Sequence, residues 1–350
     1  MGMRQRDALP SPSAAQRVLE PTGHLRVAYV EPSDLSRWLA TSGMYPLAIV
    51  SLGSTVPRSY PCPVVHLELP RLDGPGHCEV WNSDQPVHFF SSGIFSAAMA
   101  GDTLFGSIAV NEEPECRLDL VTEIAYRDLL QQLRRLGFPH LWRTWNYFPR
   151  INEEQQGLER YRRFCVGRHE ALAEALPDFP SALPAATAVG TRSGPLQIYF
   201  LAGTHPAIHL GNPRQVDAYR YPRTYGPRSP SFARATLCRS DGTMQLFISG
   251  TSSVVGYESQ HPGQVEMQAR ETITNLRALI ERAECCPSGV EAGSGPQSIF
   301  KVYVRNPDHL GLVRRALQDP LFLSSRLIYL QADLCRKELL VEIEGLVTTD

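Results

Sequence analysis

The sequence predicts an α+β fold made of two copies of one structural unit. Two observations support this prediction. Segments that alternate between apolar and polar residues are interspersed with segments of helical period, and both halves of the chain show these segments in the same order. The length of 350 residues and the apolar content of 43% allow two domains of ordinary size, each with its own core.

The second half of the chain shows the order of elements most clearly. Glycine ends its first strand, and the long helix that follows has apolar side chains three or four positions apart, as a buried helix face requires. The expected elements are a strand at 244–250, a helix at 264–283, a β-rich run at 298–305, a helix that begins at Asn306-Pro-Asp, a strand at 327–334 and a final strand within 332–346.

The first half repeats this order with little sequence identity. The proline- and alanine-rich segment 177–188 is interpreted as an insertion in the first copy, and 289–296 as a flexible loop in the second. The expected elements are a strand at 87–93 that answers the strand at 244–250, a helix at 118–136, a β-rich run at 140–148, a helix at 154–176 and a strand at 196–201.

The break between the two copies is expected within residues 207–223. We therefore predict a flexible N-terminus, 1–25, a degenerate N-terminal copy, 26–215, and a C-terminal copy, 216–350, that carries the catalytic residues. Because one chain then holds both copies, we expect it to act as a monomer.

Charge and composition exclude several classes of partner. The formal net charge is −2, and basic runs and basic amphipathic helices are absent from the sequence, so nucleic acid and membranes are not expected partners. No apolar run is long enough to span a bilayer, and the first residues lack the apolar core of a signal peptide, which indicates a cytoplasmic protein. The eight cysteines show no metal-binding spacing, and neither a metal nor another cofactor is expected.

The closing segment places two carboxylates on one face of a short apolar strand. Side chains alternate along a strand, so Glu342 and Glu344 point one way while the apolar residues beside them point the other. A glutamate held in a cleft has a raised pKa and can deliver a proton. The alternative is an edge strand whose acidic face meets water, and for Glu344 a solvated or purely structural role is expected.

Three segments of the C-terminal copy resemble the reactive intermediate deaminase (YjgF/Rid-like) family. They are Leu246-Phe-Ile-Ser-Gly250, residues 264–280 and residues 335–345. The resemblance implies chorismate mutase-like units, each a mixed β-sheet with two helices packed on one face, and it implies ligand clefts between units.

Four further motifs, in order along the chain, resemble a narrower family. The likeness covers residues 80–350 and is to the chorismatases, which split chorismate into pyruvate and a ring product. The motifs are Asn146-Tyr-Phe-Pro-Arg-Ile-Asn152, residues 157–168, residues 221–234 and residues 248–256.

The chorismatase resemblance implies roles for individual residues. By its place in the motif, Glu342 matches the catalytic acid, which protonates the enolpyruvyl methylene. Cys335 stands where the hydroxybenzoate-forming branch carries cysteine rather than alanine, with a packing role as the alternative. Arginine suits the two carboxylates of chorismate because its guanidinium donates two parallel hydrogen bonds. The expected substrate contacts are Tyr161, Arg168, Tyr221, Arg228 and Ser252.

The implied function is cleavage of chorismate to pyruvate and 3-hydroxybenzoate, with 4-hydroxybenzoate as a second product to test for. One alternative is hydrolysis to 3,4-dihydroxycyclohexa-1,5-dienoate and pyruvate. Another is a Rid-like imine deaminase or a small-metabolite binding protein. The deaminase pattern requires an arginine where Leu327 stands, beside Arg326, and this departure weighs against that alternative.

Overall fold

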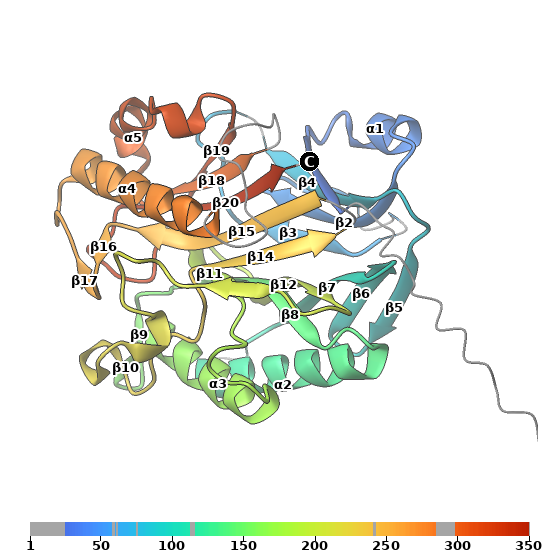
Figure 1. Cartoon of the computed structure of the whole chain (residues 1–350), viewed down its shortest axis with the longest axis horizontal. Coiled ribbons are helices and arrows are strands. Elements are labelled where there is room, and N and C mark those ends of the chain that lie inside the picture. Colours follow the sequence, from blue (N-terminus) through green and yellow to red (C-terminus); the bar gives the residue numbers. More distant parts are fainter. Residues whose placement is uncertain are drawn as a thin grey trace, which may run out of the picture.

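The computed structural model describes residues 25–57, 60, 62–74, 76–112, 116–240, 243–284 and 298–349. The expected flexible N-terminus, except Leu25, and the expected loop at 289–296 lie outside these residues. Within the described residues, large β-sheets surround one core and the helices lie on the outside (Figure 1). The predicted α+β fold is confirmed.

The C-terminal sheet is mixed and carries two helices on one face. Its strands β18 and β19 are parallel and its other neighbours are antiparallel. Helices α4 (Val265–Glu284) and α5 (Leu310–Ala316) share an apolar core with it. Its strand order is β13 (Ile208–Leu210), β14 (Ala235–Ser240), β15 (Thr243–Ser252), β20 (Val341–Thr349), β18 (Ile299–Val304) and β19 (Arg326–Gln331).

The middle sheet repeats this topology. Its strands β8 and β11 are parallel, its other neighbours are antiparallel, and helices α2 (Leu118–Leu136) and α3 (Arg160–Ala175) cover one face. Its strand order is β11 (Ala185–Thr191), β8 (His140–Pro149), β12 (Leu196–Gly203), β7 (Thr103–Val110), β6 (Phe95–Ala100) and β5 (His88–Ser92).

A third, shorter sheet, the N-terminal sheet, was not foreseen. Its order and strand directions match those of β7, β12, β8 and β11 in the middle sheet and of β15, β20, β18 and β19 in the C-terminal sheet, with α1 (Leu35–Thr41) in the place of α4. The counterparts of β13, β14 and α5 are missing from its described part. It consists of β1 (Arg26–Val30), β4 (His77–Ser83), β2 (Tyr45–Leu52) and β3 (Val64–Leu67).

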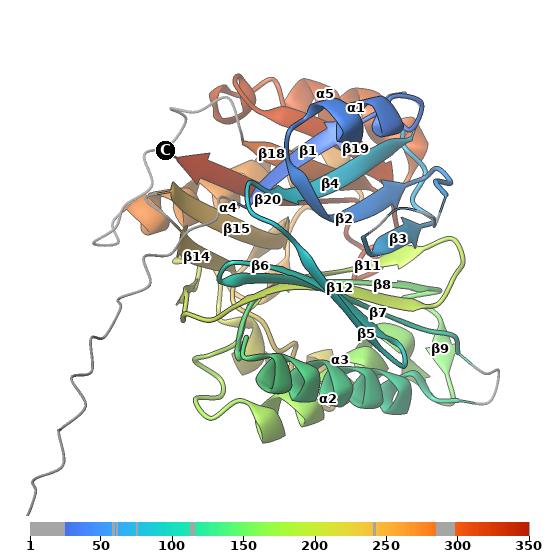
Figure 2. The ribbon, with the colours of Figure 1, turned by 90° about the vertical axis from the view of Figure 1, so that its right-hand side faces the viewer.

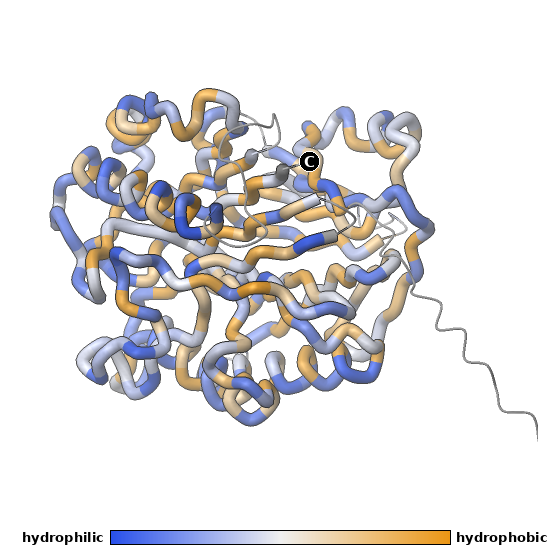
Figure 3. Tube along the Cα trace, in the orientation of Figure 1, coloured by the Kyte–Doolittle hydropathy of each residue, from blue (hydrophilic) through white to orange (hydrophobic). Residues whose placement is uncertain are grey.

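The three sheets pack their helix-free faces against one another. Figure 2 shows α2 and α3 on one side of the molecule, with α1 and α5 on the opposite side and strands between them. The apolar segments in Figure 3 follow these strands. Trp81, Trp145 and Phe247, one from each sheet, form a cluster with ring centres 5.7 to 6.5 Å apart. A single core therefore joins all three sheets.

Several sequence predictions need correction. Helix α3 begins at Arg160 rather than 154, because β9 (Glu154–Gln155) and β10 (Leu158–Glu159) form a hairpin first. Residues 177–188 are not only an insertion, since β11 begins at Ala185. The strand expected at 327–334 ends at Gln331.

The match between the two larger units also differs from the prediction. Strand β5, the expected counterpart of β15, takes the place of β13 at the edge of its sheet, and β7 corresponds to β15. Strand β13 already belongs to the C-terminal sheet, although it precedes residue 216. The division at 215 stays a prediction.

Short elements complete the description. The hairpin of β16 (Val254–Val255) and β17 (Glu258–Ser259) follows β15, and 3₁₀ turns occupy Ala218–Arg220, Arg223–Tyr225, Pro307–His309 and Pro320–Phe322. Among the described helices, none has both the length and the apolar composition that crossing a membrane would need.

Candidate active site

A cavity of about 460 Å³, the main cavity, lies between the middle and C-terminal units. One wall comes from the β9–β10 hairpin and the first turn of α3, including Tyr161. The other comes from the end of β15, the loop before β20 and the start of β20, with Ser252, Cys335 and Glu342. A smaller inner cavity of about 40 Å³ shares Tyr161, Cys335 and Glu342 with it and reaches Arg168.

Glu342 is a buried acid in the wall shared by both cavities. Strand pairing places it between Ser252 and Tyr303, and it is only 4% exposed. Burial raises the pKa of Glu342 to about 7, although a hydrogen bond from Ser252 Oγ, 3.1 Å from Glu342 Oε2, opposes the shift. Glu342 is therefore protonated below that pH and can act as a general acid. The alternative of a wet acidic face on an edge strand is wrong, because β20 lies inside its sheet.

An irregularity in β15 makes room for the Glu342 carboxyl. The register between β15 and β20 shifts between Ile248 and Thr251, and Gly250 lies in this stretch. A Cβ atom at Gly250 would lie 2.2 Å from Glu342 Oε1, well inside van der Waals contact. The Gly250 backbone N–H donates to Thr187 Oγ1 (3.0 Å), which ties this stretch to the middle sheet. The close approach of backbone and acid therefore requires glycine.

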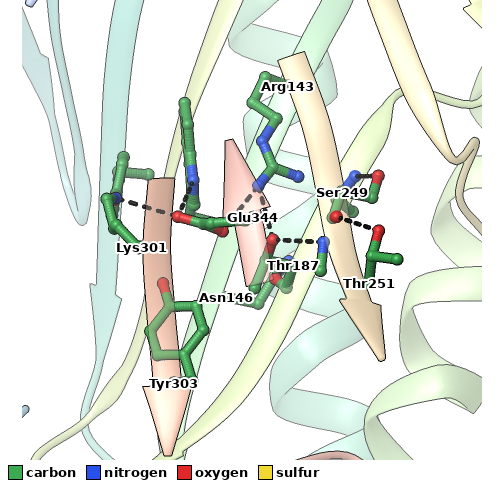
Figure 4. Close-up of polar contacts among 12 residues, drawn as sticks. Arg143, Asn146, Thr187, Ser249, Thr251, Lys301, Tyr303 and Glu344 are labelled. Atoms are coloured by element: carbon green, nitrogen blue, oxygen red, sulfur yellow. Dashed lines mark hydrogen bonds and ion pairs between the residues drawn. The ribbon is translucent and has the colours of Figure 1, made fainter. Parts of the chain in front are cut away.

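Glu344, one pleat further along β20, belongs to a buried ion cluster (Figure 4). Arg143 Nη2 donates to Glu344 Oε2 (2.8 Å), and Lys301 Nζ lies 3.1 Å from Glu344 Oε1. Burial alone would raise the pKa of Glu344, but Lys301 and Arg143 hold it below its ordinary value. Glu344 is thus an ionised structural acceptor, and it is not solvated.

Lys301 is the point at which the three sheets meet. Its Nζ lies 2.6 Å from Glu79 Oε2 on β4 and 3.0 Å from Tyr199 OH on β12, in addition to its contact with Glu344 on β20. Strands β4, β12 and β20 hold the same place in their sheets, so Glu79, Tyr199 and Glu344 are equivalent positions. The charges of Glu79 and Glu344 balance those of Lys301 and Arg143.

Cys335 and Tyr161 provide neutral groups beside the acid. Burial raises the pKa of Cys335 to about 12 and that of Tyr161 well above 10. Both side chains therefore keep their protons at neutral pH. Because the thiolate is the reactive form of cysteine, Cys335 serves as a neutral wall group rather than as a nucleophile.

The positively charged residues that line the main cavity were not among the site residues predicted from the sequence. Arg234 Nη2 donates to Tyr221 OH (2.7 Å), and the Arg336 guanidinium lies 4.2 Å from the ring centre of Tyr225. Guanidinium groups fixed in this way suit carboxylates. Arg234 is the last residue of the 221–234 motif, and Arg336 directly follows Cys335. Their positions in the sequence therefore already indicated that both lie near the site. The cationic residues that line the main cavity are Arg162, Arg234, Arg336 and Lys337.

Comparison with known proteins identifies the family that has this architecture. Residues 79–202 match the family model described as "Chorismatase FkbO/Hyg5-like, N-terminal". The chain is 37% identical over 304 residues to a 3-hydroxybenzoate synthase from Streptomyces hygroscopicus, which covers 84% of this chain and 87% of that protein. The chain belongs to the chorismatase family. A second relative, a chorismatase from the same organism, is 37% identical over 279 residues, or 79% of this chain and 80% of that protein.

A solved chorismatase structure has the same fold as this chain. The crystal structure of that chorismatase superposes with a TM-score of 0.82 at 33% identity, and the match covers 93% of this chain and 98% of that one. The arrangement of units therefore extends through nearly the whole of the chorismatase structure.

In this member of the chorismatase family, most predicted site residues meet at one place. The inner cavity adds Arg168, whose Nε donates to Tyr126 OH (2.9 Å) and whose Nη2 donates to Thr144 Oγ1 (3.1 Å). Arg168 is therefore largely engaged by the protein itself. The predicted residues that line the main cavity are Tyr161, Tyr221, Ser252, Cys335 and Glu342.

Two arginines lie away from the chorismatase cavity. Arg228 is exposed and forms an ion pair with Glu170 on α3 (2.8 Å), because its loop turns back over that helix. The structure does not bring Arg228 to the site. Arg326 donates to the backbone oxygen of Tyr29 (3.0 Å) in the N-terminal sheet, so it does not supply the arginine of a deaminase pattern to the main cavity.

Proposed function

We propose that this chain cleaves chorismate to pyruvate and 3-hydroxybenzoate, and that Glu342 is the catalytic acid. The observation that carries the proposal is a glutamic acid with a pKa of about 7, buried in a cavity whose wall includes several arginines. The relatives named 3-hydroxybenzoate synthase and chorismatase support the choice of substrate and product.

The reaction begins with proton transfer from Glu342 to the methylene carbon of the enolpyruvyl group. The enolpyruvyl group of the substrate becomes an oxocarbenium-like group. The oxygen of the neighbouring ring hydroxyl then bonds to the ring carbon that carries the ether and loses its proton, while the bond from that carbon to the ether oxygen breaks and pyruvate leaves. The original carbon–oxygen bond of the hydroxyl breaks next, the oxygen takes up a proton on its new carbon, and loss of the proton from that carbon restores aromaticity. Two protons are taken up and two are released, so the Glu342 carboxyl returns to its starting state.

Substrate binding is assigned to both walls of the main cavity. Arg234 and Arg336 hold the carboxylates, while Tyr221 fixes Arg234 through its hydroxyl. Tyr161 and Ser252 flank the reacting group beside Glu342, and Arg168 shapes the inner cavity from behind. Arg228 has no role in this arrangement.

The test is incubation of the purified chain with chorismate. Pyruvate is measured with a coupled dehydrogenase, and the aromatic product is identified by chromatography and mass spectrometry. Stoichiometric pyruvate and 3-hydroxybenzoate are expected, and the same analysis measures any 4-hydroxybenzoate. Absence of pyruvate would refute the function.

Cys335→Ala should shift the product toward 3,4-dihydroxycyclohexa-1,5-dienoate. The thiol fills the wall next to Glu342, and its removal makes space for a water molecule that competes with the internal hydroxyl. The ratio of diene diol to 3-hydroxybenzoate measures the effect, and an unchanged ratio would show that Cys335 only packs. The matched control is Cys238→Ala, because this buried thiol lies outside both cavities.

Gly250→Ala should lower kcat at least ~10-fold, because the new methyl group displaces the Glu342 carboxyl from its productive position. The displaced atoms are the end of a side chain, so the free energy of unfolding should change by only about 1 kcal/mol. Gly311→Ala, where the nearest atom is 4.0 Å away, is the control. Equal kcat in the two variants would contradict the crowding argument.

We further propose that the chain acts as a monomer in the cytoplasm. One chain supplies all three sheets around the shared core, which supports the monomer. The described cysteines Cys62, Cys78, Cys116, Cys165, Cys238 and Cys335 are free thiols, which suits a reducing compartment.

A further inference from the structure

A second cleft of about 440 Å³ lies between the N-terminal and middle sheets, nearly as large as the main cavity. One wall is β3, which carries His66, together with Glu68 directly after it. The other wall includes Gln197 at the start of β12 and Ala109 near the end of β7. The main cavity uses the matching parts of the next unit, the end of β15 and the start of β20.

Strand register makes the two sites equivalent. In the middle sheet, Gln197 pairs with Tyr147 on β8 and Ala109 on β7. In the C-terminal sheet, Glu342 pairs with Tyr303 on β18 and with a residue of β15 in the same way. Gln197 therefore occupies the position of the catalytic acid, but its amide has no proton to transfer. The second cleft can bind a molecule without the chemistry of Glu342.

The charge of the second cleft differs from that of the main cavity. None of the described residues that line it is an arginine or a lysine, and the charged group in its wall is the carboxylate of Glu68. A dianion such as chorismate would therefore meet no opposite charge there. The remaining polar groups are hydroxyls, amides and an imidazole, which pair with uncharged hydroxyl groups. They belong to Ser96, Ser107, Asn111, Ser193, Gln197 and His66.

We propose that the second cleft is a non-catalytic binding site for an uncharged, polyhydroxylated small molecule. Its size matches a single six-membered ring with several hydroxyl groups, since the main cavity of similar volume is assigned to chorismate. Its recognition elements are the amides of Asn111 and Gln197 and the serine hydroxyls, with Glu68 disfavouring anions.

Saturation-transfer NMR on the full chain tests the class of ligand. The probes are methyl β-D-glucopyranoside and myo-inositol. The charged control is methyl β-D-glucuronide, the carboxylate analogue of the glucoside. At least one uncharged probe should receive saturation at millimolar concentration, and the glucuronide should receive several-fold less than the glucoside. Absence of transfer to both uncharged probes, or equal transfer to the glucuronide, overturns the proposal.

One variant tests the location. Ala109→Trp fills the cleft from an exposed strand position, so it should abolish saturation of the uncharged probes while chorismate turnover and the melting temperature stay unchanged. Probe binding that persists in Ala109→Trp refutes the site.

Discussion

Glu342→Gln is expected to lower kcat for chorismate cleavage by two to four orders of magnitude. General acid catalysis contributes roughly 10²- to 10⁴-fold, and the glutamine amide has the same shape as glutamic acid but no proton to donate. The arginines of the main cavity are unchanged in this variant, so chorismate should still bind with near-normal affinity. Initial rates of pyruvate release and calorimetric titration with chorismate measure the two effects.

The control is Glu338→Gln, which changes an exposed carboxylate that lines the same cavity. Its rate should stay within a few-fold of the native rate. Stability provides a second check, because a buried acid whose pKa is raised from 4.5 to about 7 destabilises the fold progressively between these two pH values and by a constant amount above them. Above pH 7, Glu342→Gln should therefore be at least as stable as the native chain. A variant with normal turnover would refute the assignment of Glu342.

The same acid sets the pH dependence of catalysis. The reaction requires protonated Glu342, and the pKa of this group in the free protein is about 7. The value of kcat/KM should therefore be constant on the acidic side and fall about tenfold per pH unit above 7. Rates across a buffer series test this expectation. A profile that stays flat up to pH 9 would mean that another group supplies the proton.

Lys301→Met is expected to destabilise the chain by about 3–5 kcal/mol. Lys301 is buried and its ammonium lies between Glu79 and Glu344, so its removal leaves an excess of negative charge in the core. Because single domains are stable by only about 5–15 kcal/mol, much of the folded population could be lost at physiological temperature. Urea unfolding followed by fluorescence measures the change.

The chain offers a close control, since Lys337 is its other lysine. Lys337 is exposed, and Lys337→Met should change the free energy of unfolding by less than about 0.5 kcal/mol. The double variant Lys301→Met with Glu79→Gln restores the balance between Glu344 and Arg143, and it should regain part of the stability. A double variant less stable than Lys301→Met would contradict the charge-balance argument.

Periodicity located the elements whose buried face is long and continuous. Helix α2 spans the predicted residues, and α4 begins and ends within a residue of the prediction, because their apolar side chains face one sheet along their whole length. The N-terminal sheet was missed because its described part has only four strands and lacks the second helix, so the repeat pattern was incomplete.

The position and burial of an individual side chain depend on contacts with distant segments, which the local sequence pattern does not encode. Glu342 was predictable because alternation on a strand fixes its direction and the family motif fixes its role. Arg228 was not, because a loop rich in glycine and proline has no repeating geometry, and here it turned toward Glu170. The burial of Glu344 depended on Arg143 and Lys301, which come from distant parts of the chain.

His77, Gln197 and Glu342 each precede by two residues the side chain that their strand sends to Lys301. In an assembly of three identical subunits, any mutation at such a position is copied three times, and the penalty of a buried acid is tripled. A single gene encodes the three positions separately here. Of the three side chains, His77 contacts Arg326 (3.2 Å), Gln197 is a neutral amide, and only Glu342 is an acid. A substitution at one of the three positions therefore leaves the other two unchanged.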